Sequence, residues 1–163
     1  MDEIAEAAGV TKPVLYQHFP SKRALYVELL EDTGRQLLTS LADATGRAGS
    51  GRERVELGFR AYFNFAVNNR SSFRLLLGTT IRSDPEFARI VEEIINAAAE
   101  TVSTLIEIDA TDEQRLVLAN ALVGMGEGVS RRALQDDGPT MDPDQLATWI
   151  AELAWFGLRG VRA

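Results

Sequence analysis

The chain contains no cysteine and only one histidine, His18, among its 163 residues. Without thiols there is no disulfide framework, no thiolate zinc site, no iron–sulfur site and no cysteine nucleophile. A single imidazole likewise leaves no histidine cluster for a metal. Because the chain also lacks a phosphate-binding loop and an evident carboxylate pair, we expect neither an enzyme nor a protein that holds a metal or cofactor.

Positive charge and long hydrophobic runs are also scarce. The 17 Lys and Arg residues against 24 Asp and Glu residues give a formal net charge of −7, which excludes a bulk basic surface for nucleic acid. No stretch approaches the roughly 18 uninterrupted apolar residues of a membrane span. The acidic start Met1-Asp2-Glu3 is unlike a secretory signal peptide. We therefore expect a soluble, cytoplasmic protein with no membrane partner.

The apolar residues recur at helical spacing almost from end to end. Strand signals are weak, because alternation of branched and aromatic residues is nowhere sustained and no Asn-Gly or Asp-Gly hairpin turn occurs. Glycine, proline and aspartate clusters predict the breaks between helices, at Gly9, Pro20-Ser21, residues 46–51, residues 83–85, residues 109–112 and residues 136–143. The sequence thus predicts an all-α protein.

Two long segments have informative faces. In one, a leucine stripe predicts the inward side, formed by Leu25, Leu29, Leu37 and Leu41. The segment from Leu116 to Val129 is apolar nearly all round, which predicts burial on all sides. In so small a domain this suggests that another subunit covers one side, so we expect a homodimer contact through this segment and Leu146–Leu158. A buried helix in a monomer is the alternative.

The first twenty residues have the spacing of a helix-turn-helix. Small apolar residues on one face of residues 4–8 allow a second helix to cross closely. Gly9 can adopt the left-handed conformation that ends the first helix. Thr11 is placed to cap the next helix, whose Leu15 and Phe19 are expected to face inward.

The same spacing turns a polar set outward. The candidate DNA-binding residues are Thr11, Lys12, Pro13, Tyr16, Gln17 and His18 and, at the start of the next helix, Lys22. A helix of two turns fits the major groove with its first residues toward the base edges. Lys12 can donate to guanine and Gln17 can pair with adenine, whereas Thr11, Tyr16 and His18 can contact phosphates. An ordinary helical hairpin with a packed histidine is the alternative.

These residues together resemble the DNA-binding signature of the tetracycline-repressor (TetR) family. The residues that carry the resemblance are Ile4-Ala5, Ala8-Gly9-Val10, Leu15-Tyr16, His18-Phe19, Lys22 and Leu25. The remaining chain is similar to the family in architecture alone. The resemblance implies a homodimeric transcription regulator, usually a repressor, in which a small molecule bound in the helical body repositions two DNA-reading heads.

The resemblance also implies a further helix before this signature, and Met1 stands directly where that helix would end. We therefore expect either an upstream start or a truncated chain. The expected domains are residues 1–26, a helix-turn-helix DNA-binding head whose first helix is missing, and residues 27–163, a helical ligand-binding and dimerisation domain. The head has no net charge and the body carries −7, so DNA contact is expected at the head alone.

Aromatic residues gather in the body, between Phe59 and Phe73. Ordinary core packing explains any one of them, but such a cluster can also line an apolar pocket. Asn120 and Glu127 interrupt an apolar segment, and a buried carboxylate needs a partner. We predict a cavity for a small apolar or amphipathic ligand, lined by Phe59, Tyr62, Phe63, Phe73, Asn120 and Glu127.

The leading hypothesis is a ligand-responsive transcription regulator, acting as a repressor, that binds a palindromic site on double-stranded DNA as a homodimer. The alternative is a small-molecule-binding helical dimer that does not bind DNA in this truncated form. The sequence names neither the ligand nor the DNA site.

Overall fold

The structure is a computed structural model that describes residues 1–78, 83–133 and 142–160, with side chains described as far as residue 157. Every regular element in these ranges is an α-helix, which confirms the all-α prediction. The expected break at residues 136–139 lies outside the described residues. None of the helices in these ranges is long and apolar enough to cross a membrane. In chain order the helices are α1 (Asp2–Ala7), α2 (Lys12–His18), α3 (Lys22–Thr45), α4 (Gly51–Asn68), α5 (Arg70–Leu77), α7 (Pro85–Leu105), α8 (Asp112–Ala133) and α9 (Pro143–Gly160).

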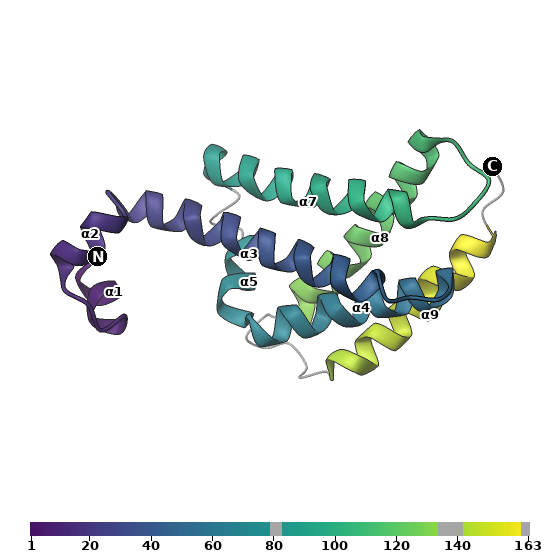
Figure 1. The fold of residues 1–163 in the computed structure, drawn as a ribbon, viewed down its shortest axis with the longest axis horizontal. Helices are drawn as coiled ribbons and strands as arrows, with labels where there is room; N and C mark the ends of the chain where they lie inside the picture. Colours follow the sequence, from purple (N-terminus) through teal and green to yellow (C-terminus); the bar gives the residue numbers. More distant parts are fainter. Residues whose placement is uncertain (79–82, 134–141, 161–163) are drawn as a thin grey trace.

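A small head stands at one end of a larger helical body (Figure 1). The head consists of α1 and α2, and α3 leads from it along the body for 24 residues. Within the body α3 packs against α4 and α7, while α4 packs on α9 and α7 on α8. The expected domain boundary after residue 26 falls inside α3, so head and body share one continuous helix.

The turn of the head follows the sequence signals with one exception. Gly9 has φ +67°, a left-handed conformation that glycine adopts without strain. The amides of Gly9 and Val10 donate back to carbonyls of α1 at 3.1 and 3.0 Å. Thr11 occupies the N-cap position of α2, but its side chain accepts no capping hydrogen bond, so the expected cap is wrong. Ser21 does cap α3, accepting from the amide of Ala24 at 3.0 Å.

The starts of two body helices confirm the cap signals. Asp84 caps α7 by accepting from two first-turn amides at 3.0 and 3.4 Å, directly ahead of Pro85. At α8, the Thr111 hydroxyl accepts from the Gln114 amide at 3.2 Å, and the Gln114 side chain accepts from the Thr111 amide at 2.8 Å. This reciprocal capping box satisfies two amides that the helix itself leaves unpaired.

The core has two parts that meet at α4. One lies among α3, α4, α5 and α7, and the other lies mainly between α4 and α9. In α3 the fully buried leucine is Leu30, whereas Leu29 is 38% exposed. The expectation that Leu29 faces inward is therefore wrong, because the buried face of α3 passes through Leu30, Gly34 and Leu37.

One side of α8 is uncovered in the single chain. Val117 is 65% exposed, and Asn120, Gly124 and Gly128 are exposed on the same side of the helix. The opposite side is buried at Ala119, Gly126 and Ser130. A single chain therefore buries only one side of α8, and whether a second subunit covers the other side, as expected from the sequence, stays a prediction.

A close crossing of α3 and α7 fixes the position of the helix that carries the head. A Cβ atom on Gly34 would lie 2.5 Å from Cδ1 and 2.6 Å from Cγ1 of Ile94. Such distances are far inside van der Waals contact, so any side chain at this position would force the Ile94 side chain to move. Glycine here therefore lets Ile94 of α7 pack directly against the backbone of α3.

We predict that Gly34→Ala lowers the free energy of unfolding by roughly 1–3 kcal/mol, because the added methyl overpacks the crossing. Gly58→Ala is the matched control. A Cβ on Gly58 would meet Thr45 Cγ2 at 3.5 Å, an ordinary contact, so this variant should gain up to about 1 kcal/mol from helix propensity. Urea unfolding measures both, and a Gly34→Ala protein as stable as the parent would contradict the close crossing.

Candidate nucleic-acid interface and ligand cavity

Helix α2 presents its polar side chains to solvent and one leucine to the interior. Leu15 is 7% exposed and Tyr16 is 43% exposed. The structure therefore places the candidate DNA-binding residues of α2 on the outside of a helix at the end of the molecule. The exposed set comprises Thr11, Lys12, Pro13, Tyr16, Gln17 and His18.

Lys12 has a partner within the head. Its Nζ lies 2.8 Å from Oδ1 of Asp2 and donates to Oδ2 at 3.1 Å. The hydrogen bond, with the charge of the partner, raises the pKa of Lys12 and lowers the pKa of Asp2. Both side chains are exposed, and exposed ion pairs are weak. Lys12 therefore stays positively charged. A phosphate or base edge that binds Lys12 must displace the Asp2 carboxylate.

The start of α3 carries two further cations with different surroundings. Lys22 is exposed, and its Nζ lies 5.8 Å from the centre of the Tyr26 ring. Arg23 turns toward the body instead, where Nη1 and Nη2 bind the two carboxylate oxygens of Asp84 at 2.7 and 2.8 Å. Its Nε donates to Glu86 at 2.5 Å. Arg23 therefore ties the head end of α3 to the first turn of α7.

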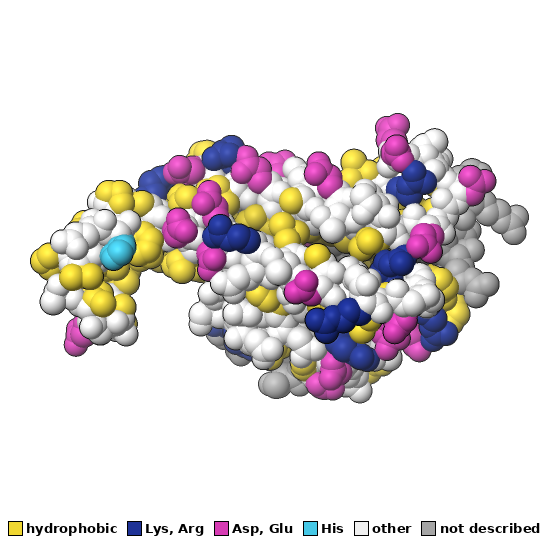
Figure 2. Space-filling model, in the orientation of Figure 1, with side chains coloured by type: hydrophobic (Ala, Val, Ile, Leu, Met, Phe, Trp, Pro, Cys, Tyr) yellow, Lys and Arg dark blue, Asp and Glu magenta, His cyan; other side chains and the backbone are white. Residues whose placement is uncertain are grey.

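Charge is distributed unevenly between head and body. On the face shown in Figure 2, acidic and basic side chains gather from α3 onward, while the head shows mainly apolar and uncharged groups beside the histidine. The pKa of Asp84 is lowered, first by its hydrogen bond to Arg23. The head therefore shows little charge on this face, whereas Arg23 and Asp84 form a charged contact between α3 and the start of α7.

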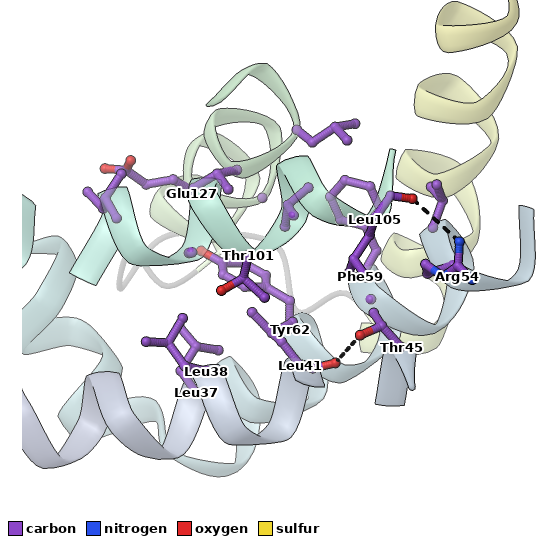
Figure 3. Close-up of a pocket in the computed structure, with 18 of the residues that line it drawn as sticks. Leu37, Leu38, Leu41, Thr45, Arg54, Phe59, Tyr62, Thr101, Leu105 and Glu127 are labelled. Atoms are coloured by element: carbon purple, nitrogen blue, oxygen red, sulfur yellow. Dashed lines mark hydrogen bonds between the residues drawn. The ribbon is translucent and has the colours of Figure 1, made fainter. Parts of the chain in front are cut away.

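A cavity of about 340 Å³ lies in the body among α3, α4, α7 and α8, with α9 at one end (Figure 3). Its size falls within the range of ligand pockets, ~300–1,000 Å³. The lining is mainly aliphatic and aromatic. Among the described residues, the larger apolar side chains that line it include Leu37, Leu38, Leu41, Val55, Phe59, Tyr62, Phe73, Leu76, Val91, Ile94, Ile95, Val102, Leu105, Leu122, Val123 and Trp155.

Four of the six candidate ligand-binding residues line this cavity, and two do not. Phe59, Tyr62, Phe73 and Glu127 are among the lining residues. Phe63 lies instead in the core between α4 and α9, because it is one position farther round α4 than Tyr62. Asn120 lies on the uncovered side of α8, where its Nδ2 donates to the Leu116 carbonyl at 2.9 Å. The side chains of Phe63 and Asn120 therefore do not line this cavity.

The polar groups of the cavity are held by identifiable partners. The Glu127 side chain is 19% exposed, and its Oε1 lies 2.5 Å from Nη2 of Arg131. Arg131 also donates to the carbonyl of Leu77 at the end of α5, at 3.3 Å. Burial raises the pKa of the Tyr62 hydroxyl, and the nearby Glu127 charge adds to the shift. Tyr62 therefore stays neutral and can donate a hydrogen bond.

Sequence reasoning missed most of the cavity wall. The leucines of α3 and the isoleucines of α7 fit a core pattern equally well, so nothing marked them as lining residues. Arg54 also escaped notice, although the sequence held a signal for it. Arg54, Gly58 and Tyr62 recur four residues apart, which places them on one face of α4.

Both parts of the chain match families of bacterial regulators. Residues 1–29 match the family described as "Bacterial regulatory proteins, tetR family". Residues 52–157 match the family described as "Tetracyclin repressor-like, C-terminal domain". Together the two matches cover the head with the start of α3 and nearly all of the body from α4 onward.

Whole proteins give the same result. The chain is 32% identical to the "HTH-type transcriptional activator FasR" of Mycolicibacterium smegmatis over 163 residues, which are 99% of this chain and 74% of that protein. It is 25% identical to the "HTH-type transcriptional regulator EthR" of the same species, over 94% of this chain and 73% of that protein. A TetR-like regulator from Rhodococcus sp. RHA1 superposes with a TM-score of 0.77 at 28% identity, covering 98% of this chain and 84% of that one. The chain belongs to the tetracycline-repressor (TetR) family of transcription regulators, whose DNA-binding domain includes α1 and α2.

Proposed function

We propose that this protein is a ligand-responsive transcription regulator that binds a palindromic site on double-stranded DNA as a homodimer. The observation that carries the proposal is the outward polar set of α2, held at the end of the molecule by a buried Leu15. A short helix with exposed polar side chains and a firmly packed inner side is suited to the major groove.

The residues of the head divide into two roles. Lys12 and Gln17 lie on the exposed side of α2 and have the donors and acceptors that read base edges. Tyr16 and His18 fix the register of the helix by contacting phosphates. Lys22 lies in the first turn of α3, where free amides and the positive end of the helix dipole favour a further phosphate.

The uncovered apolar surface of the body supports a dimer. Trp149, Leu153 and Phe156 recur on one side of α9 and are 50%, 63% and 62% exposed. Val117 of α8 is equally exposed. Large apolar side chains that are exposed on two neighbouring helices form a surface that a second copy of the chain would bury. Two heads in such a dimer would enter successive major grooves, about 34–36 Å apart.

The response to ligand follows from the walls of the cavity. Helix α3 lines the cavity and continues into the head, and α7 lines it from the other side and holds Arg23 through Asp84. A ligand that changes the separation of these two helices favours a different position of the head, which is a shift between existing states. We assign repression as the outcome, because a dimer that covers promoter DNA excludes the polymerase. The FasR relative is named an activator, a role that would use the same DNA contacts.

One observation favours a second candidate, a ligand-binding dimer that does not bind DNA in this form. The one lysine of α2 is already paired with Asp2, and residues 1–26 carry no net charge. A measurement of DNA binding by this chain separates the two candidates. Retention of a duplex pool at low salt supports the regulator, and absence of any retained duplex supports the alternative.

We predict that Lys12→Ala weakens binding to a duplex selected from a random-sequence pool by roughly 1–3 kcal/mol, the size of a base contact. Tyr16→Phe should weaken it less and uniformly across sequences, because it removes one phosphate donor. Mobility shifts at several salt concentrations measure both effects, and sedimentation verifies that the oligomeric state is unchanged.

Two controls make this test specific. Asp2→Asn releases Lys12 from its ion pair, so binding should become tighter rather than weaker. Arg89→Ala removes an exposed cation from the body and should leave DNA affinity unchanged. Equal losses in all four variants would contradict the assignment of α2.

We predict that Leu153→Glu converts a dimer into a monomer, because a carboxylate would be buried without a partner at the contact. Leu29→Glu is the control, since Leu29 is an exposed leucine of α3, a helix that packs against α4, α5 and α7. Sedimentation at micromolar concentration distinguishes the species. A dimer in both variants, or a monomer in the parent protein, would refute this interface.

A further inference from the structure

The two ends of the cavity differ in charge. Arg54 lies at one end and Glu127 toward the other, with Tyr62 and Thr101 between them (Figure 3). Among the described residues that line the cavity, Arg54 is the single cation. A molecule with one charged end therefore meets a chemically distinct environment at each end.

Arg54 is largely withdrawn from water, but its partner is not. The Arg54 side chain is 20% exposed, whereas that of Glu107 is 68% exposed. Nη1 of Arg54 donates to Oε1 of Glu107 at 2.7 Å and, at 3.4 Å, to the carbonyl of Leu105 (Figure 3). Glu107 lies two residues after Leu105, the last residue of α7, so it belongs to a connecting segment rather than to a helix. The pair thus joins a fixed cation to a carboxylate at the surface.

The surroundings of Arg54 form a compact end to the cavity. A Cβ on Gly51 would lie 3.5 Å from the Trp155 ring and 4.0 Å from Oε2 of Glu107. The start of α4, the end of α7 and α9 therefore meet around the arginine. Because α4 begins at Gly51, Arg54 also lies in its first turn, where the helix dipole favours an anion.

Most N–H donors of the Arg54 guanidinium make no hydrogen bond to the described residues. In the described part of the chain, Nη1 alone among its nitrogen atoms makes a hydrogen bond. A guanidinium binds a carboxylate or phosphate through two parallel hydrogen bonds when both oxygens can reach it. An exposed partner such as Glu107 contributes little and is readily replaced by a competing anion.

We propose that Arg54 binds the anionic head of an amphipathic ligand whose apolar part fills the cavity. Without this ligand Arg54 binds the Glu107 carboxylate, which the head of the ligand displaces. The inference rests on the proposed ligand response and adds the class of ligand to it. At the other end of the cavity the Glu127 carboxylate already binds Arg131, so Arg54 is the cation that the lining offers to the head. Carboxylate and phosphate heads share this chemistry.

The test compares four probes that have the same twelve-carbon chain: dodecanoate, dodecyl phosphate, dodecan-1-ol and dodecylammonium. Trp155 lies beside the proposed head site, so its emission reports binding in a Trp149→Phe background. Dodecanoate should bind at least about tenfold more tightly than dodecanol, the size of one charge-assisted hydrogen bond, and dodecylammonium more weakly than both. The ratio between dodecanoate and dodecyl phosphate identifies which head is preferred.

Two variants should act in opposite directions on the same ratio. Arg54→Gln should remove the preference for dodecanoate over dodecanol and leave dodecanol binding unchanged. Glu107→Gln should strengthen dodecanoate binding several-fold, because the competing carboxylate is gone, again without effect on dodecanol. Arg60→Gln is the matched control, since Arg60 lies on α4 outside the cavity lining and pairs with Glu56. If Arg54 had a purely structural role, Arg54→Gln would weaken the binding of dodecanoate and of dodecanol alike.

The outcomes separate this inference from the proposed function. Tight dodecanol binding with no preference for dodecanoate, or equal losses of both in Arg54→Gln with no gain in Glu107→Gln, overturns the anion site and leaves the cavity function standing. Failure of all four probes to bind the parent protein overturns the proposed ligand response and this inference with it. Helical circular dichroism verifies the fold of each variant, and Glu107→Gln tests the site even if Arg54→Gln does not fold.

Discussion

The close crossing of α3 and α7 at Gly34 and Ile94 is the constraint on which the rest of the structure depends. It brings together the helix that carries the head and the helix that forms much of the cavity wall. Because interiors are close-packed, a change in volume on one side of such a crossing is felt on the other. Arg23 of α3 joins the same two helices a second time, near the head, because it binds Asp84 and Glu86 at the start of α7. Any molecule that fills the cavity therefore acts on two helices already joined at two points.

The head was predictable from the sequence because each of its signals is local. Gly9 at the turn, Leu15 inside and Tyr16 outside follow from backbone conformation and helical spacing alone. The expected cap at Thr11 was wrong for a reason of the same kind, because position favours a cap but does not fix the rotamer of the hydroxyl. The contact between Lys12 and Asp2 could not be predicted, since it depends on how the two short helices cross.

The cavity was predictable only in part, because periodicity does not distinguish a wall from a core. Phe59 and Phe63 lie one turn apart on α4 and both belong to the core between α4 and α9, yet Phe59 alone of the two also lines the cavity. That difference depends on where α7 and α9 lie, which no local pattern contains. Arg54 was missed because charged residues at helical spacing usually face water. Its partner Glu107 comes from a segment 53 residues away in sequence.

The ion pairs of Arg23 have a consequence for how DNA affinity responds to ionic strength. Half of the Arg23 side chain is exposed, so dissolved ions screen its attraction to Asp84 and Glu86. The same ions compete with the head for phosphates. Added electrolyte thus loosens the intramolecular tether and the intermolecular contact together. The slope of log affinity against log salt will then exceed the value set by phosphate contacts alone, and counting contacts from that slope would overstate the footprint of the head.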